Sequence, residues 1–252
     1  MRLKYGDRRD ATPNPFPECR CARLGEGDNN PAGRKVAHNS MVENAECAPS
    51  MRGIPAVILA GGRSRRMGGG DKCLLALGGR PVLTHVIARI RPQVAALALN
   101  ANGDPARFAA FDLAVLPDSV PDFAGPLAGV LAAFDWAVQV APEAGHVLTV
   151  PADTPFLPRD LVARLAAAID ATHDTALAES GGRLHPVVGL WPLARRDALR
   201  LALEEGLRKV EDWTGRLAAA RITFDAVPVD PFFNVNDPDD LAAATRLLAR
   251  PD

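Results

Sequence analysis

The stretch Val57-Ile-Leu-Ala-Gly-Gly-Arg-Ser-Arg-Arg-Met-Gly-Gly-Gly-Asp-Lys72 passes from an apolar run into glycine and positive charge within a few residues. The apolar run, Pro55 to Ala60, has the length and composition of a buried strand. Gly61 and Gly62 then permit a tight turn and a close approach of the backbone to a ligand, because glycine has no Cβ. The stretch therefore predicts a strand that leads directly into a ligand-binding loop.

The loop is strongly cationic, with Arg63, Arg65, Arg66 and Lys72 set against a single acid, Asp71. In such a loop, backbone N–H groups can line a polyphosphate while the cations neutralise it. The P-loop pattern fails because no Ser or Thr follows the lysine, and the glycines lack the one-then-two spacing of the dinucleotide fingerprint. A solvated, flexible loop is the alternative, but the preceding strand and Lys72 at the far end favour phosphate binding.

The composition is that of an ordinary globular protein: 252 residues, 48% hydrophobic and 23% charged, with a formal net charge of −1. No global basic field indicates a nucleic-acid partner, and no run of roughly 18 apolar residues predicts a membrane span. The cysteines show no zinc-like spacing, so reduced thiols in a cytoplasmic protein are the simplest interpretation. They are Cys19, Cys21, Cys47 and Cys73.

Residues 1–50 differ in composition from the rest of the chain. They are rich in Pro, Asn, Gly, Arg and Glu and poor in aliphatic clusters. Such a segment cannot bury enough apolar surface to offset the entropy of ordering, so we expect a disordered tail, followed by one domain over residues 51–252. A start of translation at Met41 or Met51, which would make the tail non-native, is a further hypothesis.

Strands and helices alternate from residue 51 onward, which predicts a doubly wound, Rossmann-like α/β sheet with helices on both faces. The connection Ser180-Gly-Gly182 is so short that the strands on either side of it must be antiparallel, so the sheet should be mostly parallel with one reversed strand. His85, on the first helix, is expected to be a polar surface residue. The predicted strands after the first are 94–99, 113–117, 146–150, 175–179, 187–191 and 222–229, and the predicted helices are 81–91, 125–136, 159–173, 195–203, 207–217 and one after Asp237.

Polar residues follow three of these strands where each one ends, namely Asn100, Asp118 and Asp153. The carboxyl ends of the strands border the ligand crevice in an open parallel sheet, so these residues should converge with Gly61. Asn102 is followed by glycine and fits plain turn chemistry, so Asn100 is favoured as the ligand contact. The alternative for Asp118 is the capping of a turn.

Asp153 lies between two prolines, Pro151 and Pro155, which restrict the backbone on either side of it. Mg²⁺ usually takes one or two protein carboxylates and completes its shell with phosphate oxygens and water. One rigid aspartate opposite a cationic loop meets that need, so we expect Mg²⁺ as the cofactor. Asp153 could instead cap the following helix, but Thr154 or Asp160 could do so equally well.

The motif Leu59-Ala-Gly-Gly-x-Ser-x-Arg-Met-Gly-x-x-x-Lys72 resembles the signature loop of nucleotidyltransferases and, in detail, that of the molybdenum cofactor guanylyltransferases. The resemblance extends from about Ile54 to Leu248. It implies the transfer of GMP from GTP to molybdenum-molybdopterin, which yields the guanine dinucleotide cofactor and pyrophosphate. Molybdoenzymes or their chaperones would receive the product, and we expect a monomer.

The resemblance also implies roles for individual residues, with Asp153 as the magnesium ligand. Lys72 and Arg66 would stabilise charge on the transferred group and on the departing pyrophosphate. For His185, the alternative to a role in acceptor binding is a structural hydrogen bond. Asp237 is better explained as a helix cap before Pro238. The implied nucleotide contacts are Leu59, Ala60, Gly61, Gly62, Lys72, Asn100, Asp118 and Asp153, and the implied acceptor contacts are His185, Asn234 and Asn236.

Three other functions remain open. A cytidylyltransferase acting on molybdopterin would share the loop and the metal aspartate, but its loop typically reads Leu-Ala-Ala-Gly, whereas this one reads Leu59-Ala-Gly-Gly. A sugar-phosphate nucleotidyltransferase would share the fold. A non-enzymatic nucleotide-binding regulator could keep the loop but would not need Asp153.

Overall fold

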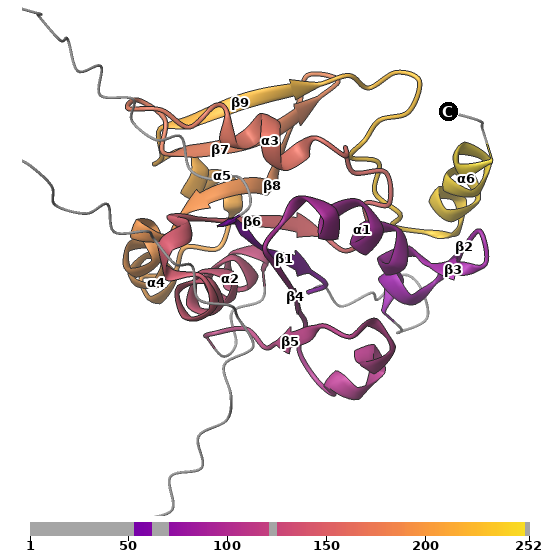
Figure 1. Cartoon of the computed structure of the whole chain (residues 1–252), viewed down its shortest axis with the longest axis horizontal. Helices are drawn as coiled ribbons and strands as arrows, with labels where there is room; N and C mark the ends of the chain where they lie inside the picture. The colour runs from indigo at the N-terminus through magenta and orange to yellow at the C-terminus, as the bar shows by residue number, and fades with distance from the viewer. Residues whose placement is uncertain (1–52, 62–70, 121–124, 250–252) are drawn as a thin grey trace, which may run out of the picture. The chain divides into compact units, whose positions relative to one another are not determined.

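The computed structural model describes residues 53–61, 71–120 and 125–249 (Figure 1). The expected disordered tail and the hypothesis of a later start both lie outside the described residues. The same holds for most of the cationic loop, including Gly62 and Arg66.

A sheet of seven strands forms the centre of the described chain, in the order β5-β4-β1-β6-β8-β7-β9. Every neighbouring pair is parallel except those of β8, which runs antiparallel to both β6 and β7. The predicted mostly parallel sheet with one reversed strand is confirmed. The strands are β1 Pro55–Leu59, β4 Ala96–Asn100, β5 Ala114–Leu116, β6 His146–Pro151, β7 Thr175–Ser180, β8 Arg183–Pro192 and β9 Ala219–Phe224.

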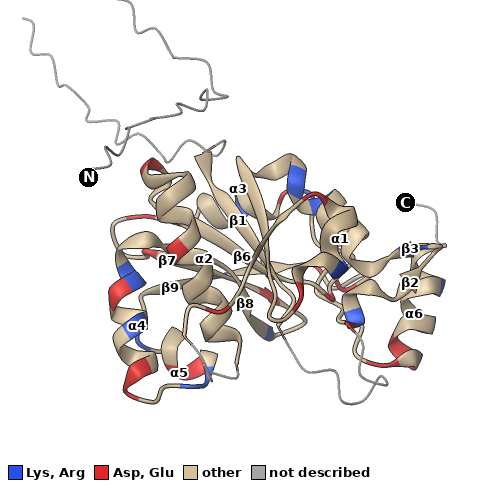
Figure 2. Cartoon of the chain, turned by 90° about the horizontal axis from the view of Figure 1, so that it is seen from below, with Lys and Arg blue, Asp and Glu red and all other residues tan. Residues whose placement is uncertain are grey.

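Helices cover both faces of this sheet, as predicted, because buried residues of β1 face alternately to either side. Ala56 and Ile58 pack in the cluster that contains α1 and α3, whereas Val57 and Leu59 pack in the cluster that contains α2, α4 and α5. Figure 2 shows α1 and α3 on the opposite side of the strands from α4 and α5. The helices are α1 Val82–Ile90, α2 Pro126–Val140, α3 Leu161–Ala166, α4 Arg196–Glu204, α5 Val210–Thr214 and α6 Pro238–Leu248.

The strand order reverses at β1. The chain continues from β1 to β4 and β5 on one side and then returns to place β6 on the other side. Leu59, the last residue of β1, is in register with Asn100 of β4 and with Pro151 of β6. Open α/β sheets bind ligands at the carboxyl ends of the strands beside such a reversal, so the topology places the crevice where β1 and β6 end.

Three predicted elements differ most in extent from the observed ones. Helix α3 ends at Ala166 rather than at residue 173, because the Asp170 carboxylate accepts hydrogen bonds from the backbone N–H groups of Thr172 and His173 and forms a turn. Strand β9 covers Ala219–Phe224 rather than 222–229, because its register follows β7 over the whole length of that strand. The helix predicted over 207–217 is only Val210–Thr214.

The surface location predicted for His85 is wrong. Its side chain is 8% exposed, and its Nε2 lies 2.9 Å from the carbonyl oxygen of Leu77. Leu77 belongs to a small hairpin of β2 Ala76–Leu77 and β3 Arg80–Pro81, whose strand pairing buries Leu77 beside α1. Gly78 and Gly79 form the turn between the two strands, at φ +58° and +80°.

The hairpin also contacts the C-terminal part of the chain. Leu77, Val82, Val235 and Ala244 form a third buried cluster that joins the hairpin, the start of α1 and helix α6. This packing brings the segment before α6 close to the residues that follow the cationic loop. It is the feature of the fold that completes the candidate site.

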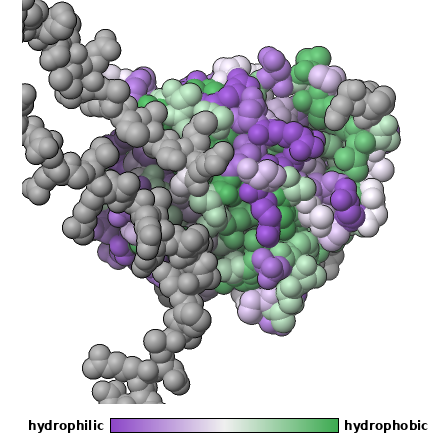
Figure 3. All heavy atoms as spheres, in the orientation of Figure 1, coloured by the Kyte–Doolittle hydropathy of each residue, from purple (hydrophilic) through white to green (hydrophobic). Residues whose placement is uncertain are grey.

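Among the helices that the structure describes, none combines the length and the apolar composition needed to cross a bilayer. On the face shown in Figure 3, hydrophilic and hydrophobic residues are intermixed. Among the residues described, the exposed large hydrophobic ones are separate in the fold: Val140 in α2, Leu201 in α4, Val227 in the loop after β9 and Leu248 in α6.

Candidate functional site

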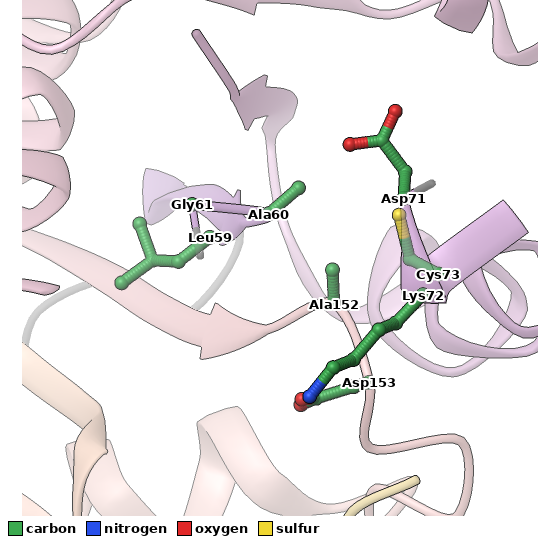
Figure 4. Close-up of a pocket in the computed structure, with 8 residues that line it drawn as sticks. All are labelled: Leu59, Ala60, Gly61, Asp71, Lys72, Cys73, Ala152 and Asp153. Atoms are coloured by element: carbon green, nitrogen blue, oxygen red, sulfur yellow. The ribbon is translucent and has the colours of Figure 1, made fainter. Parts of the chain in front are cut away.

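A pocket opens where β1 and β6 end, at the position that the topology predicts (Figure 4). One wall comes from the end of β1, a second from the residues after the cationic loop, and a third from the residues after β6. The lining residues are Leu59, Ala60, Gly61, Asp71, Lys72, Cys73, Ala152 and Asp153. Five of these lining residues were predicted from the sequence as site residues, namely Leu59, Ala60, Gly61, Lys72 and Asp153.

Lys72 and Asp153 meet in this pocket although they are far apart in the chain. Figure 4 shows the ends of both side chains pointing into the same part of the pocket. Lys72 begins a short 3₁₀ turn, Lys72–Leu74, and its Nζ donates a hydrogen bond of 3.3 Å to Oδ1 of Asn236. A cationic amine and a carboxylate are thus held beside one another at the ligand edge of the sheet.

Asp153 is subject to opposing electrostatic effects. Burial raises its pKa, whereas its own backbone N–H, the charge of Lys72 and the Thr154 side chain lower it. The backbone around it is held on both sides, since Ala152 N–H donates to Leu59 O at 3.0 Å and Val235 N–H donates to Asp153 O at 2.9 Å. Burial outweighs the contacts that favour the ionised carboxylate, so the pKa is raised overall. A cation bound beside the carboxylate would stabilise its ionised form.

The donor set suits a hard cation that takes most of its ligands from elsewhere. Within the described ranges, no three or more His, Cys, Asp or Glu side chains are grouped so that they could hold a metal by themselves. Asp153 does not cap the helix that follows it, because the N-cap residue of α3 is Asp160. One carboxylate facing an open pocket fits Mg²⁺, which keeps several sites for phosphate oxygens and water.

The sequence did not indicate Cys73 as part of the pocket wall. The residue is 4% exposed, and burial, followed by the charge of Asp71, raises the pKa of the thiol to about 12. The thiol is therefore neutral at physiological pH and shapes the pocket without serving as a nucleophile.

Asn100, Asn102 and Asp118 form one hydrogen-bonded group at the ends of β4 and β5. The two asparagine Nδ2 atoms donate to the two oxygens of the Asp118 carboxylate, from Asn100 at 3.0 Å and from Asn102 at 2.7 Å. The N–H of Asp118 donates in turn to Oδ1 of Asn102 at 2.9 Å. The structural role expected for Asn102 therefore extends beyond its own turn to the orientation of Asp118.

Asn100 is the buried member of this group and is only 1% exposed. Its Nδ2 also donates to the carbonyl oxygen of Leu116 at 3.1 Å, so both amide hydrogens have acceptors. Its Oδ1 is directed towards Gly61 and Gly129, since a Cβ added to those glycines would lie 3.7 and 2.5 Å from it. Any contact of Asn100 with a ligand would therefore come from Oδ1, on the Gly61 side.

The predicted acceptor residues lie in two places. Asn234 and Asn236 adjoin the pocket, because Oδ1 of Asn234 accepts a 2.7 Å hydrogen bond from Thr154 and Oδ1 of Asn236 accepts one from Lys72. The predicted cap at Asp237 is confirmed, since its Oδ1 accepts from Asp240 N–H at 2.9 Å.

His185 belongs to a separate group at the end of β7. Ser180 Oγ donates to Asp230 Oδ1 at 2.8 Å and lies 2.8 Å from Nε2 of His185, so the imidazole proton is on Nε2 and Nδ1 is an acceptor. The ring packs on Phe232 at a centroid distance of 4.6 Å. Burial lowers the pKa of His185, and Asp230 partly opposes this effect. The imidazole is therefore neutral at pH 7.

The chain is similar to proteins of known sequence and structure. A model of the MobA-like NTP transferase domain matches residues 56–219. A molybdenum cofactor guanylyltransferase of Bradyrhizobium sp. (strain ORS 278) is 57% identical over 201 residues, which cover 79% of this chain and 95% of that protein. A molybdenum cofactor guanylyltransferase of Rhodopseudomonas palustris (strain HaA2) is 55% identical over 198 residues, with 78% and 92% covered.

Solved structures share the fold at lower identity. The molybdopterin-guanine dinucleotide biosynthesis protein A of Archaeoglobus fulgidus superposes with a TM-score of 0.60 at 21% identity, over 78% of this chain and 99% of that one. A Mycobacterium tuberculosis protein solved in complex with manganese gives a TM-score of 0.57 at 19% identity, over 78% and 100%.

Proposed function

The chain belongs to the family of MobA-like NTP transferase domains, and we propose on this basis that it transfers GMP from GTP to molybdenum-molybdopterin. An oxygen of the acceptor's terminal phosphate forms a bond to the α-phosphorus of GTP. The bond from that phosphorus to the bridging oxygen breaks, and pyrophosphate leaves. The products are the guanine dinucleotide form of the cofactor and pyrophosphate.

One observation carries the proposal: Lys72 and Asp153 converge in a pocket at the strand reversal, beside the glycine-rich turn at Gly61. Both substrates are anionic, so the enzyme must align them and neutralise their repulsion, and no protein nucleophile is required. Lys72 is proposed to contact the phosphates, in exchange for its hydrogen bond to Asn236. Arg66, which lies outside the described residues, is proposed to share this role.

Mg²⁺ is the proposed cofactor, and Asp153 is the residue that would hold it. When bound, the cation supplies positive charge to the phosphate oxygens and reduces the charge repulsion between the two substrates. Lys72 lowers the pKa of Asp153 and so favours the ionised form that a cation needs. The manganese in the Mycobacterium tuberculosis structure is consistent with a divalent ion in a protein of this fold.

The remaining predicted residues take roles that match their positions. Leu59, Ala60, Gly61 and Gly62 are proposed to approach the nucleotide with their backbone, with Asn100 and Asp118 on the nucleoside side. Asn234 and Asn236 are proposed to meet the acceptor phosphate next to Lys72. His185 is proposed to offer its Nδ1 to a donor group of the acceptor, because its Nε2 is already engaged by Ser180.

The substrate assay offers the purified protein each nucleoside triphosphate with Mg²⁺ and molybdenum-molybdopterin and follows pyrophosphate release. We expect GTP to be the preferred donor, in keeping with the Leu59-Ala-Gly-Gly loop. Highest turnover with CTP would overturn the guanine assignment. Turnover with a sugar phosphate in place of molybdopterin would establish the sugar-phosphate alternative, and binding of GTP without turnover would indicate a regulator.

The metal aspartate is tested by Asp153→Asn, which keeps the shape of the side chain and removes its charge. We expect kcat to fall by about 10²-fold or more, because the metal loses its protein ligand. Chelation of divalent ions should abolish wild-type turnover, and added Mg²⁺ should restore it.

The matched control is Asp160→Asn, because Asp160 is a 61% exposed side chain that makes no capping hydrogen bond. The control should keep wild-type turnover, and both variants should keep the wild-type circular dichroism spectrum. Wild-type activity in Asp153→Asn would remove this residue from the mechanism.

A further inference from the structure

Arg107 is a residue that neither the signature loop nor the strand ends indicate. It lies in the 3₁₀ segment Pro105–Phe111, between β4 and β5, and its guanidinium carbon is 4.7 Å from the centre of the Phe108 ring. Its side chain is 30% exposed. It reaches from this segment to two different parts of the candidate nucleotide site.

The Nε of Arg107 contacts Asp71, at the end of the cationic loop. Its Nε lies 2.5 Å from Oδ2 of Asp71, the residue directly before Lys72. The Nε–H is not aligned for a hydrogen bond, so the contact is an ion pair. Asp71 caps the 3₁₀ turn of Lys72 through its backbone position only, because its carboxylate makes no capping hydrogen bond. The carboxylate is therefore oriented by Arg107 and not by the turn that it precedes.

The two terminal nitrogens of Arg107 donate hydrogen bonds to the turn after β4. Its Nη2 donates to the carbonyl oxygen of Asn102 at 2.5 Å, and its Nη1 donates to that of Asp104 at 2.8 Å. The side chain of Asn102 in turn donates to the carboxylate of Asp118 and accepts from its N–H. A continuous set of polar contacts thus connects Asp71, next to Lys72, with Asp118 on the nucleoside side.

We propose that Arg107 is a positioning residue that couples the phosphate side of the nucleotide site to its nucleoside side. It acts through Asp71 on one side and through Asn102 on the other, and it touches no substrate. The planar guanidinium can make all three contacts at once, which a lysine amine cannot do from a single point of charge. This inference rests on the proposed function, because it assumes that both sides serve one nucleotide.

The test measures coupling in GTP affinity. Asp71→Asn removes the charge that pairs with Arg107, and Asn102→Ala removes the contacts with Asp118 while keeping the carbonyl that Arg107 contacts. The dissociation constant of GTP with Mg²⁺ is measured by calorimetry for both single variants and the double variant. The same cycle is repeated in the Arg107→Gln background, with thermal unfolding as a check on folding.

With Arg107 present, we expect the two substitutions to be non-additive, by about 5-fold or more in the dissociation constant. In the Arg107→Gln background they should combine independently, to within about 2-fold. Arg107→Gln alone should weaken GTP binding by roughly 10-fold, and Arg107→Lys should fall between wild type and Arg107→Gln because it keeps only the ion pair.

The matched control is Arg200→Gln. Arg200 is 32% exposed and is also ion-paired, to Asp135 at 2.8 Å, but it belongs to α4 and does not line the pocket. This control should bind GTP as wild type does. Additive effects in the presence of Arg107, or wild-type affinity in Arg107→Gln, would overturn the inference. Absence of GTP binding by the wild-type protein would instead overturn the proposed function.

Discussion

At the scale of single residues, Cys73 illustrates how burial decides chemistry. It is adjacent to Lys72 in the chain and lines the same pocket, a setting in which a cysteine could be taken for a nucleophile. Burial, and then the charge of Asp71, raise its pKa to about 12, because a thiolate there would be both desolvated and repelled. The reaction assigned to the site needs no thiolate, so the chemistry and the pKa agree.

The raised pKa leads to a prediction about reactivity. Alkylation requires the thiolate, so Cys73 in the folded protein should remain unmodified by iodoacetamide at pH 8. In denaturant the pKa returns to its ordinary lower value, and the same residue should be labelled. Peptide mapping by mass spectrometry before and after unfolding makes this comparison. Equal labelling rates in the two states would contradict the burial of the thiol.

At the scale of elements, helix α2 lies close to β1 and β4 because of one glycine. A Cβ at Gly129, inside the helix, would lie 2.5 Å from Oδ1 of Asn100 and 3.1 Å from Cδ2 of Leu59. Asn100 cannot easily move away, because its Nδ2 is held by Leu116 and Asp118. The close approach of the helix thus keeps Asn100, and through it Asp118, in place.

The prediction concerns Gly129→Ala, which would ordinarily stabilise a helix interior by about 1 kcal/mol. Here we expect a net loss of about 1–3 kcal/mol in the free energy of unfolding, because the added methyl group collides with a fixed side chain. GTP affinity should fall as well, since Asp118 loses its support. Urea denaturation and calorimetry are the measurements.

The control for this change is Gly53→Ala, because a Cβ at Gly53 would meet nothing within 4 Å. It should leave both stability and GTP affinity close to those of wild type. A Gly129→Ala protein that is more stable than wild type would contradict this prediction, because it would show that the Asn100 side chain can move away from the added methyl group without a loss of stability.

The segment that precedes α6, from Asp230 to Asn236, contacts several parts of the proposed site. Asp230 accepts from Ser180 at the end of β7, Val235 N–H donates to the backbone oxygen of Asp153, and Asn236 accepts from Lys72. One short segment therefore contacts the strand pair that carries His185, the proposed metal ligand Asp153 and the proposed phosphate contact Lys72. The acceptor and nucleotide sides of the proposed site share this segment as a common wall.

At the scale of the whole molecule, two hydrophobic clusters, one on each face of the sheet, hold the strand ends in register. That residues 51–252 form a single domain, as the composition suggests, stays a prediction. The expected monomer likewise stays a prediction.

The domain prediction is tested with a chain that begins at Met51. We expect its thermal midpoint and GTP-dependent turnover to equal those of the full chain, because residues 1–50 lack the aliphatic clusters that a core requires. Differential scanning calorimetry and the pyrophosphate assay measure both quantities, with gel filtration to report the oligomeric state. A lower midpoint or lost activity in the shorter chain would show that the first fifty residues contribute to the fold.

The sequence by itself determined the parts of this protein that depend on short-range patterns. The apolar run before Gly61, the short connection Ser180-Gly-Gly182, and the alternation of strands and helices predicted the sheet, its one reversed strand and the edge at which Lys72 and Asp153 meet. These features follow from local backbone preferences and from the rule that parallel strands end on one side.

Only the tertiary structure decided which side chains become partners. Lys72 and Asn236 are 164 residues apart, and Arg107 connects Asp71 to the turn after β4. The hairpin at Leu77 likewise buries His85, whose helix gave no sign of such a neighbour. Contacts of this kind depend on how the elements pack against one another. The sequence pattern of one element does not indicate which side chains of another element will contact it, so only the folded structure shows them.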